Sequence, residues 1–336
     1  MSKAYIHKIS CFLPEHRFTN ADFFKEFPES ESSNSLKQIG IEERRIASDG
    51  VLASDLAILA SEKLFTEHNI DRTSIDFVLF CAQEFDYFTP TTACVIQDRL
   101  GLSTNCGALD FNLGCSGFVY GLSIAKGLIE TGSARNVLLL TSSTLTRQIH
   151  AKDRSSRYLF GDGAAATLVS SRSEEGVGLF QFGTDGGGKN KIIVEEGGNR
   201  NPLSASSNME KVDAYGNVTT PSSFYMNGTG IFLFGLRTVP DLVEKTLKVN
   251  LLEIEDIDLV IFHQANAFLL ETLRKKMEIP EEKMYICMKN TGNTVSSTIP
   301  IALSDAIKRG KVQYGSKILL VAFGVGLSWG ATVVEL

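Results

Sequence analysis

Asp110-Phe111-Asn112-Leu113-Gly114-Cys115-Ser116-Gly117-Phe118 is the stretch that decides how this chain folds. An apolar run typical of a strand leads into it, and a helical pattern of apolar residues leads out. Cys115 therefore lies on a tight turn, where Gly114 and Gly117 let the backbone bend and a substrate approach. Free N–H groups at a helix start favour the thiolate. We expect Cys115 to be a nucleophile on a strand–turn–helix elbow, although cysteines that only pack a helix start are more common.

The second half of the chain repeats the first. Three segments recur in order: 75–80 as 257–262, 136–140 as 317–321, and 163–168 as 330–335. Residues 115–132 also align with 293–310 without a gap. The repeated segments are continuous apolar runs, which are typical of strands buried on both faces. The sequence therefore predicts an α/β fold of two duplicated halves, 1–172 and 173–336, each with a mixed sheet covered by helices.

The repeat also relates two polar residues to Cys115. His263 follows the apolar strand expected at 257–262, and α/β folds often place catalytic groups at such strand ends. Asn293 occupies the position in the second half that Cys115 occupies in the first. Taken singly, His263 would more often be structural and Asn293 a turn residue. If they converge on Cys115, the three groups can activate a thiol and stabilise an acyl oxyanion.

Composition limits the classes of function. The 336 residues carry a formal charge of −6, which argues against a nucleic-acid partner. No apolar run is long enough to span a membrane, and the first residues lack a signal-peptide core. The six cysteines show no metal-binding spacing, so we expect free thiols in the cytoplasm and no metal site.

Residues 183–230 interrupt the repeat and are rich in Gly, Asn and Ser, which predicts a long loop. The apolar stretch 224–232 at its end includes Gly228 and Phe232, which we expect to lie near a substrate-binding site. Residues 183–190 superficially resemble a phosphate-binding loop. Asn190 stands where such a loop needs Ser or Thr, and β-branched residues follow where a helix is needed. Nucleotide binding is therefore not expected.

Five motifs together resemble the β-ketoacyl-ACP synthase III family of the thiolase superfamily. They fall in the family's order at 112–118, 160–165, 263–266, 292–294 and 322–330. The resemblance implies a thiolase-like five-layer αβαβα fold and a homodimer. It also implies that Cys115 takes an acyl group from coenzyme A or acyl carrier protein. His263 and Asn293 would then hold malonyl-ACP during a decarboxylative Claisen condensation, with the backbone N–H groups of Cys115 and Val325 as oxyanion hole. No cofactor is implied, since the thioesters are substrates.

The chain also departs from the family pattern. Where the family binds coenzyme A with an aromatic residue and arginines, this chain has Asn34, Gln38 and Phe268, and only Arg154 is retained. Thr89 stands where short-chain members place a phenylalanine that closes the acyl tunnel. These differences indicate a specialised member with an acyl donor other than acetyl.

Two alternatives stay open. The chain could be an acyltransferase that passes the acyl group to an oxygen or nitrogen nucleophile, with His263 as general base. It could also be a silent partner subunit of a heterodimer. The basic run of Arg274, Lys275 and Lys276 is a candidate docking site for the acidic carrier protein, although such runs are usually solvated helix faces.

Overall fold

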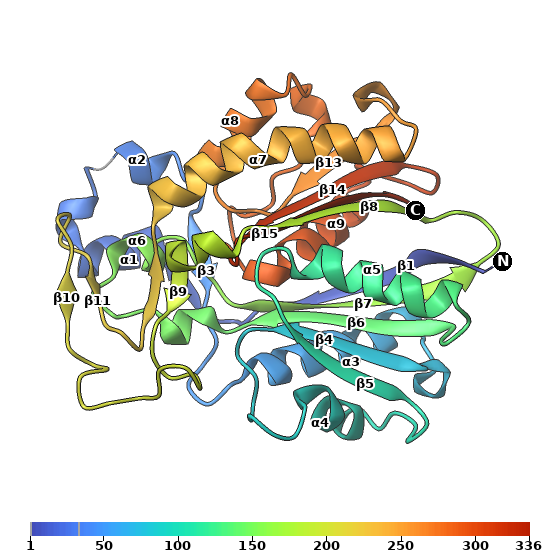
Figure 1. The fold of residues 1–336 in the computed structure, drawn as a ribbon, viewed down its shortest axis with the longest axis horizontal. Coiled ribbons are helices and arrows are strands. Elements are labelled where there is room, and N and C mark those ends of the chain that lie inside the picture. Colours follow the sequence, from blue (N-terminus) through green and yellow to red (C-terminus); the bar gives the residue numbers. More distant parts are fainter. Residues whose placement is uncertain (1, 33) are drawn as a thin grey trace.

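The computed structural model describes residues 2–32 and 34–336. Two mixed sheets lie one above the other, with helices between and outside them, which gives five layers (Figure 1). The first sheet has the order β1 (Lys3–Phe12), β7 (Gly163–Arg172), β6 (Asn136–Ser143), β4 (Phe77–Ala82) and β5 (Gly107–Asn112). The second has the order β13 (Leu259–Phe262), β14 (Lys317–Gly324), β15 (Ser328–Glu335) and β8 (Val177–Thr184).

Six helices make the other three layers. α5 (Gly117–Glu130) and α9 (Thr298–Lys308) lie between the sheets, where Phe118, Leu122, Ile299 and Leu303 share one core with strands of both sheets. α3 (Ala53–His68) and α4 (Thr92–Arg99) cover the first sheet from outside, and α7 (Gly228–Val249) and α8 (Ala267–Lys276) cover the second (Figure 1). The thiolase-like layered fold expected from the resemblance is thus confirmed.

The two sheets follow the same plan. In each, a parallel pair (β4–β6 and β13–β14) is followed by antiparallel neighbours, β7 and β1 in the first sheet and β15 and β8 in the second. A single parallel bridge from Val260 to Met284 stands where the first sheet has β5. The equivalent helices α5 and α9 end at Glu130 and Lys308, and each is followed two residues later by a glycine with a positive φ. These are Gly132, with a φ of 78°, and Gly310, with a φ of 65°. The division at residue 172 itself stays a prediction.

Shorter elements gather beyond one end of the sheets (Figure 1). They are β2 (Arg17–Thr19), α1 (Asn20–Glu26), α2 (Asn34–Lys37), β3 (Glu43–Arg45), α6 (Arg154–Arg157), β9 (Ile192–Val194), β10 (Lys211–Val212), β11 (Val218–Thr219) and β12 (Phe224–Met226). Residues 183–230 are therefore not one loop, because β9 pairs with β12 and β10 with β11. Residues 186–191 form a 3₁₀ turn that leads into β9, so the helix of a phosphate-binding loop is not formed there.

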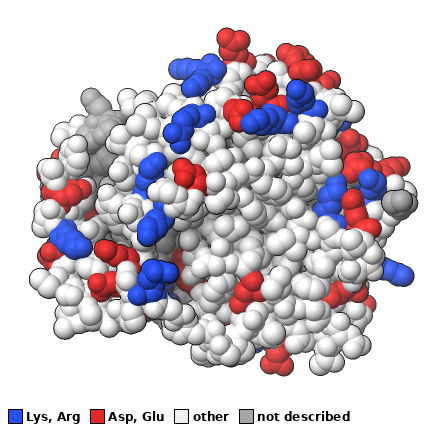
Figure 2. Space-filling model, viewed as in Figure 1, with Lys and Arg blue, Asp and Glu red and all other residues white. Residues whose placement is uncertain are grey.

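Figure 2 shows that Lys, Arg, Asp and Glu side chains gather mainly around the margin of the viewed face, and its central part is largely uncharged. Within residues 2–32 and 34–336, no helix is long and apolar enough to cross a membrane. The same part of the chain holds no group of three or more His, Cys, Asp or Glu side chains that could bind a metal ion.

Candidate active site

Cys115, His263 and Asn293 line one narrow pocket of about 70 Å³. Cys115 comes from the turn before α5, His263 from the end of β13, and Asn293 from the turn before α9. The structure therefore brings together, from both halves, the three side chains that the repeat related. The remaining lining is mostly apolar and consists of Leu159, Phe160, Ile192, Met226, Gly228, Ile231, Phe232, Ala265, Asn266, Leu269, Phe323 and Gly324.

Close packing holds the Cys115 turn in place. A Cβ atom added to Gly324 would lie 2.5 Å from the Cβ of Cys115, so the strand end opposite the cysteine has room only for glycine. A Cβ atom added to Gly114 would likewise lie 2.5 Å from the Cγ1 of Val325. The Ser116 hydroxyl lies 2.6 Å from that of Ser328, which ties the start of α5 to β15. The thiol is thereby fixed between the two sheets.

Burial decides the protonation state of Cys115. The side chain is only 8% exposed, and loss of solvent raises its pKa to about 11. The backbone N–H groups of Val325 and of Cys115 itself act in the opposite direction, because they stabilise the thiolate. The N–H groups near the helix start therefore favour the thiolate, as the sequence indicated. Desolvation outweighs the N–H groups, and the residue is a thiol at neutral pH.

His263 is held in the pocket wall by backbone and side-chain contacts. The backbone N–H of His263 donates to the backbone carbonyl of Val321 at 2.7 Å, and the imidazole Nδ1 lies 2.7 Å from the hydroxyl of Thr298. The ring of Phe323 packs against the imidazole at 6.1 Å in an edge-on arrangement. Burial lowers the pKa of His263 to about 3, so the ring is neutral, although the nearby Val295 carbonyl favours the charged form.

Asn293 is fixed through both its backbone and its side chain. Its N–H donates to the carbonyl of Leu159 at 3.0 Å, and its carbonyl accepts from Gly161 at 3.1 Å. The side-chain oxygen accepts the N–H of Val295 at 2.9 Å. This bond orients the carboxamide, so the group that Asn293 can offer to a substrate is its NH₂ donor.

The other predicted site residues divide into two groups. Gly228 and Phe232 line the pocket, and the N–H of Val325 points at the sulfur of Cys115. Thr89 and Arg154 lie outside the pocket. Thr89 is exposed on the loop after β4, and Arg154 donates to Glu29 at 2.9 Å and to the carbonyl of Tyr215.

The departures from the family pattern have different surroundings. Phe268 stacks on Phe232 with ring centroids 5.6 Å apart, which makes the rim of the pocket apolar. Gln38 is exposed, and the side chain of Asn34 lies outside the described part of the structure.

The basic run lies at the end of α8. Arg274 donates to Glu271 at 2.9 Å, and Lys275 lies 3.7 Å from the same carboxylate. Lys276 donates to the carbonyl of Leu236 at 2.9 Å. Part of the positive charge expected for docking is thus balanced by Glu271.

Sequence reasoning missed two residues that contact the site. Thr298 touches His263, and Val295 binds Asn293. Val295 lies in the turn from Asn293 into α9, the counterpart of the Cys115 turn, and Thr298 is the first residue of α9. The gapless alignment of 115–132 with 293–310 could have marked this turn as part of the site.

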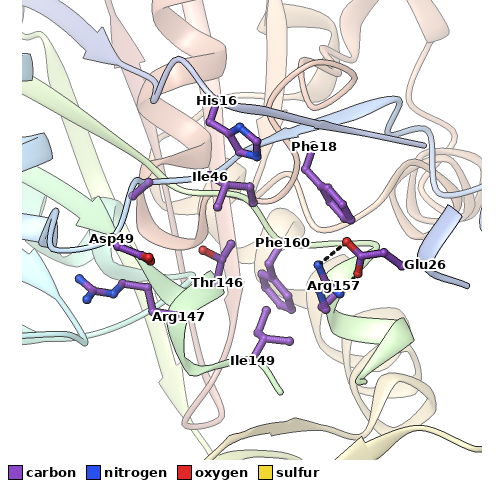
Figure 3. A pocket seen from close by; sticks show the side chains of 11 residues that line it. His16, Phe18, Glu26, Ile46, Asp49, Thr146, Arg147, Ile149, Arg157 and Phe160 are labelled. Carbon is purple, nitrogen blue, oxygen red and sulfur yellow. Dashed lines mark hydrogen bonds and ion pairs between the residues drawn. The ribbon is translucent and has the colours of Figure 1, made fainter. Parts of the chain in front are cut away.

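A larger cavity of about 300 Å³ shares the Phe160 wall with this pocket. Its acidic and basic side chains come from His16, Glu26, Asp49, Arg147 and Arg157 (Figure 3). Arg157 pairs with Glu26 and packs on Phe18 at 5.0 Å. Arg147 donates to the carbonyl of Val51 at 2.8 Å. The residues that line this cavity include the hydroxyl of Thr146 but no cysteine, so the thiol chemistry expected of Cys115 belongs to the smaller pocket.

The chain is similar to known proteins over nearly its whole length. Residues 109–186 match the family described as 3-oxoacyl-[acyl-carrier-protein (ACP)] synthase III, and residues 247–336 match its C-terminal part. The β-ketoacyl-[acyl-carrier-protein] synthase III of Caldanaerobacter subterraneus subsp. tengcongensis is 37% identical over 96% of this chain and 95% of its own length. That of Clostridioides difficile is 36% identical over 99% of this chain and 98% of its own.

Solved structures show the same relationship. A crystal structure of a 3-oxoacyl-(acyl-carrier-protein) synthase III superposes with a TM-score of 0.97 at 46% identity and covers 99% of this chain and 100% of that one. The enzyme from Thermus thermophilus superposes with a TM-score of 0.87 at 31% identity, with 99% of each chain covered. The chain therefore belongs to the β-ketoacyl-ACP synthase III family, the thiolase-fold acyltransferases that carry out condensation in fatty-acid biosynthesis.

Proposed function

We propose that this condensing enzyme runs a two-step reaction on Cys115 and takes an acyl donor other than acetyl. The observation that carries the proposal is the meeting of a thiol, a neutral imidazole and an oriented carboxamide in one apolar pocket. The substrates are thioesters of coenzyme A or of acyl carrier protein, and no metal or redox cofactor takes part.

The first step transfers the acyl group. The sulfur of Cys115 attacks the thioester carbonyl carbon while its proton moves to the neutral imidazole of His263. The N–H groups of Cys115 and Val325 hold the resulting oxyanion, and one such donor is typically worth about 3–4 kcal/mol. When the intermediate collapses, the leaving sulfur takes the proton from His263, and acyl-Cys115 remains.

The second step forms the carbon–carbon bond. The NH₂ of Asn293 and an N–H of His263 hold the thioester oxygen of malonyl-ACP while its carboxylate leaves as carbon dioxide. The electron pair of the broken bond becomes an enolate, whose carbon attacks acyl-Cys115. The Cys115 sulfur then leaves as a thiolate and takes up a proton. Because the electron pair of the enolate comes from the broken carbon–carboxylate bond, no proton has to be removed from carbon and no strong base is required.

The donor preference rests on Thr89 and on the apolar pocket. Thr89 would reach the acyl tunnel of a neighbouring subunit, and a small side chain there leaves room for a longer or branched acyl chain. The rim formed by Phe232 and Phe268 also favours apolar contact over binding of charged phosphates.

A donor screen tests this preference. Purified protein is incubated with acyl thioesters from two to sixteen carbons, and acyl-Cys115 is measured by intact mass, with Cys115→Ala as the control that cannot be acylated. We expect longer or branched donors to be preferred, and Thr89→Phe to shift the preference toward acetyl. Strict use of acetyl-CoA by the unmodified protein would contradict the proposal. Carbon dioxide release from malonyl-ACP separates condensation from simple acyl transfer.

We further propose that the carrier protein docks on the end of α8. Lys275 is exposed there, and Lys276 lies beside it. Replacing both by glutamate should raise the KM for malonyl-ACP about tenfold and leave kcat unchanged, because rim charges act mainly on encounter. Lys248→Glu, in the last turn of α7, is the matched control. An unchanged KM in the double variant would refute docking at this surface.

A homodimer and a cytoplasmic location complete the proposal. β5 is the outer strand of the first sheet, with β4 as its paired neighbour, so its other edge is free to pair with a second copy. The cytoplasmic location follows from the family's role and from cysteines that are free thiols.

A further inference from the structure

One residue in the turn before α9 contacts both polar groups of the pocket. Val295 has a φ of 55°, a left-handed conformation that is unusual for a β-branched residue. Its N–H donates to the side-chain oxygen of Asn293 at 2.9 Å, and its carbonyl accepts from the Thr298 hydroxyl at 3.1 Å. The turn thus places one peptide N–H on Asn293 and one hydroxyl next to His263.

The Thr298 hydroxyl faces two partners at once. It lies 2.7 Å from Nδ1 of His263 and 3.1 Å from the Val295 carbonyl, and both Thr298 and His263 are buried. A carbonyl can only accept, whereas a hydroxyl can donate or accept. If the hydroxyl donates to Val295, it accepts from Nδ1–H, and Nε2 keeps a lone pair. If it donates to Nδ1, the ring proton lies on Nε2.

The proposed reaction uses His263 in both of these forms. In acyl transfer the imidazole accepts a proton from Cys115, whereas in decarboxylation it donates a hydrogen bond to the thioester oxygen. Because Nδ1 is bound to Thr298, Nε2 is the ring atom left for the substrate. The Val295 carbonyl near the imidazole can only accept, so by itself it favours a form with an N–H toward it, whereas the Thr298 hydroxyl can serve both forms.

We propose that Thr298 is a positioning residue that holds His263 through Nδ1 in either protonation form, so that Nε2 can act as acceptor and then as donor. The inference rests on the proposed two-step reaction. It explains why a hydroxyl stands at the first residue of α9, where its bond to Val295 alone would be an ordinary helix-start contact.

Three variants separate positioning from packing. Thr298→Val keeps the shape and removes the hydroxyl, and Thr298→Ser restores it. Thr246→Val is the matched control, because Thr246 is also buried and donates to a backbone carbonyl (Leu242, 2.7 Å), but lies in α7 outside the pocket lining. We expect Thr298→Val to lower kcat for condensation at least tenfold with KM for malonyl-ACP within threefold. Serine should restore kcat to within threefold, and Thr246→Val should leave it unchanged.

Retention of kcat in Thr298→Val, or an equal loss in the serine variant, would overturn the inference. If the valine variant does not fold, Thr298→Ala gives the same comparison. The imidazole ¹⁵N spectrum of the substrate-free protein provides a second readout that does not need the reaction. The Nδ1 signal of His263 should shift between wild type and Thr298→Val, and identical spectra would also overturn the inference. Failure of the wild type to release carbon dioxide would instead contradict the proposed reaction.

Discussion

At the scale of single residues, the sulfur of Cys115 is subject to two opposed effects. N–H groups from its own residue and from Val325 favour the thiolate, and burial between the sheets favours the thiol. Burial wins, because charge is costly in a cavity lined by apolar side chains. The neutral imidazole of His263 has the same cause. Cys115 and His263 therefore face the pocket as a neutral thiol and a neutral imidazole rather than as an ion pair.

The pH dependence of alkylation follows from this balance. A thiol whose pKa is raised to about 11 is almost fully protonated at pH 7, and its thiolate fraction grows about tenfold for each pH unit below that pKa. We expect the rate of Cys115 alkylation by iodoacetamide to rise steadily between about pH 7 and pH 9 without a plateau. Peptide mass spectrometry resolves Cys115 from the exposed Cys94 in the same digest. A plateau below pH 8 would reveal a thiolate–imidazolium pair and contradict the burial argument.

At the scale of elements, β3 connects the turns that carry the site. The N–H of Glu42 donates to the carbonyl of Lys289 at 2.8 Å, and the carbonyl of Arg45 accepts from Asp162 at 2.7 Å. Between them, the fully buried Arg44 donates to the carbonyl of Tyr158 and to the side chain of Asn20, each at 2.7 Å. The Tyr158 ring lies 4.2 Å from the guanidinium carbon, a cation–π contact.

Removing this guanidinium should loosen the whole group of turns. Arg44→Met leaves the buried carbonyl of Tyr158 and the half-buried side-chain oxygen of Asn20 without this donor, at a cost of about 1–3 kcal/mol for a buried group and less for a half-buried one. We expect the free energy of unfolding to fall by about 2–4 kcal/mol, measured by chemical denaturation. Arg17→Met in β2, where the side chain is exposed, should change it by less than about 0.5 kcal/mol. Equal effects in the two variants would show that Arg44 has no such role.

The elements show how far the sequence alone could lead. Segments with a clear period were predicted well: apolar runs became β4, β6 and β14, and the aligned segments 115–132 and 293–310 became the two central helices. Cys115, His263 and Asn293 could be related because each follows a recognisable strand or turn. The raised pKa of Cys115 could not be predicted from the sequence, since it depends on side chains brought from distant segments. The contact of Thr298 with His263 joins residues 35 positions apart and leaves no local pattern.

At the scale of the whole molecule, one edge of the five-layer stack is open. Among the residues that the structure describes, no strand pairs with the outer edge of β5. Leu109 in β5 is 43% exposed, and Tyr87 and Phe88 on the neighbouring loop are 61% and 89% exposed. Open edge strands with exposed apolar side chains pair readily with another chain. The largely uncharged centre of the face in Figure 2 is in keeping with such a contact. We therefore expect β5 to pair with β5 of a second copy.

Sedimentation velocity tests this pairing. The wild type should sediment at twice the mass of the chain at micromolar concentration, and Leu109→Lys should weaken association at least tenfold, because the twofold axis brings two added charges together. Leu251→Lys is the matched control, since Leu251 is 91% exposed in the turn after α7. The loop that carries Phe88 also carries Thr89, so dissociation of the dimer should lower the rate of acyl transfer as well as the sedimenting mass. A wild type that sediments as a monomer, or a Leu109→Lys variant that remains a dimer, would exclude pairing through β5 and remove the basis for Thr89 as a determinant of donor length.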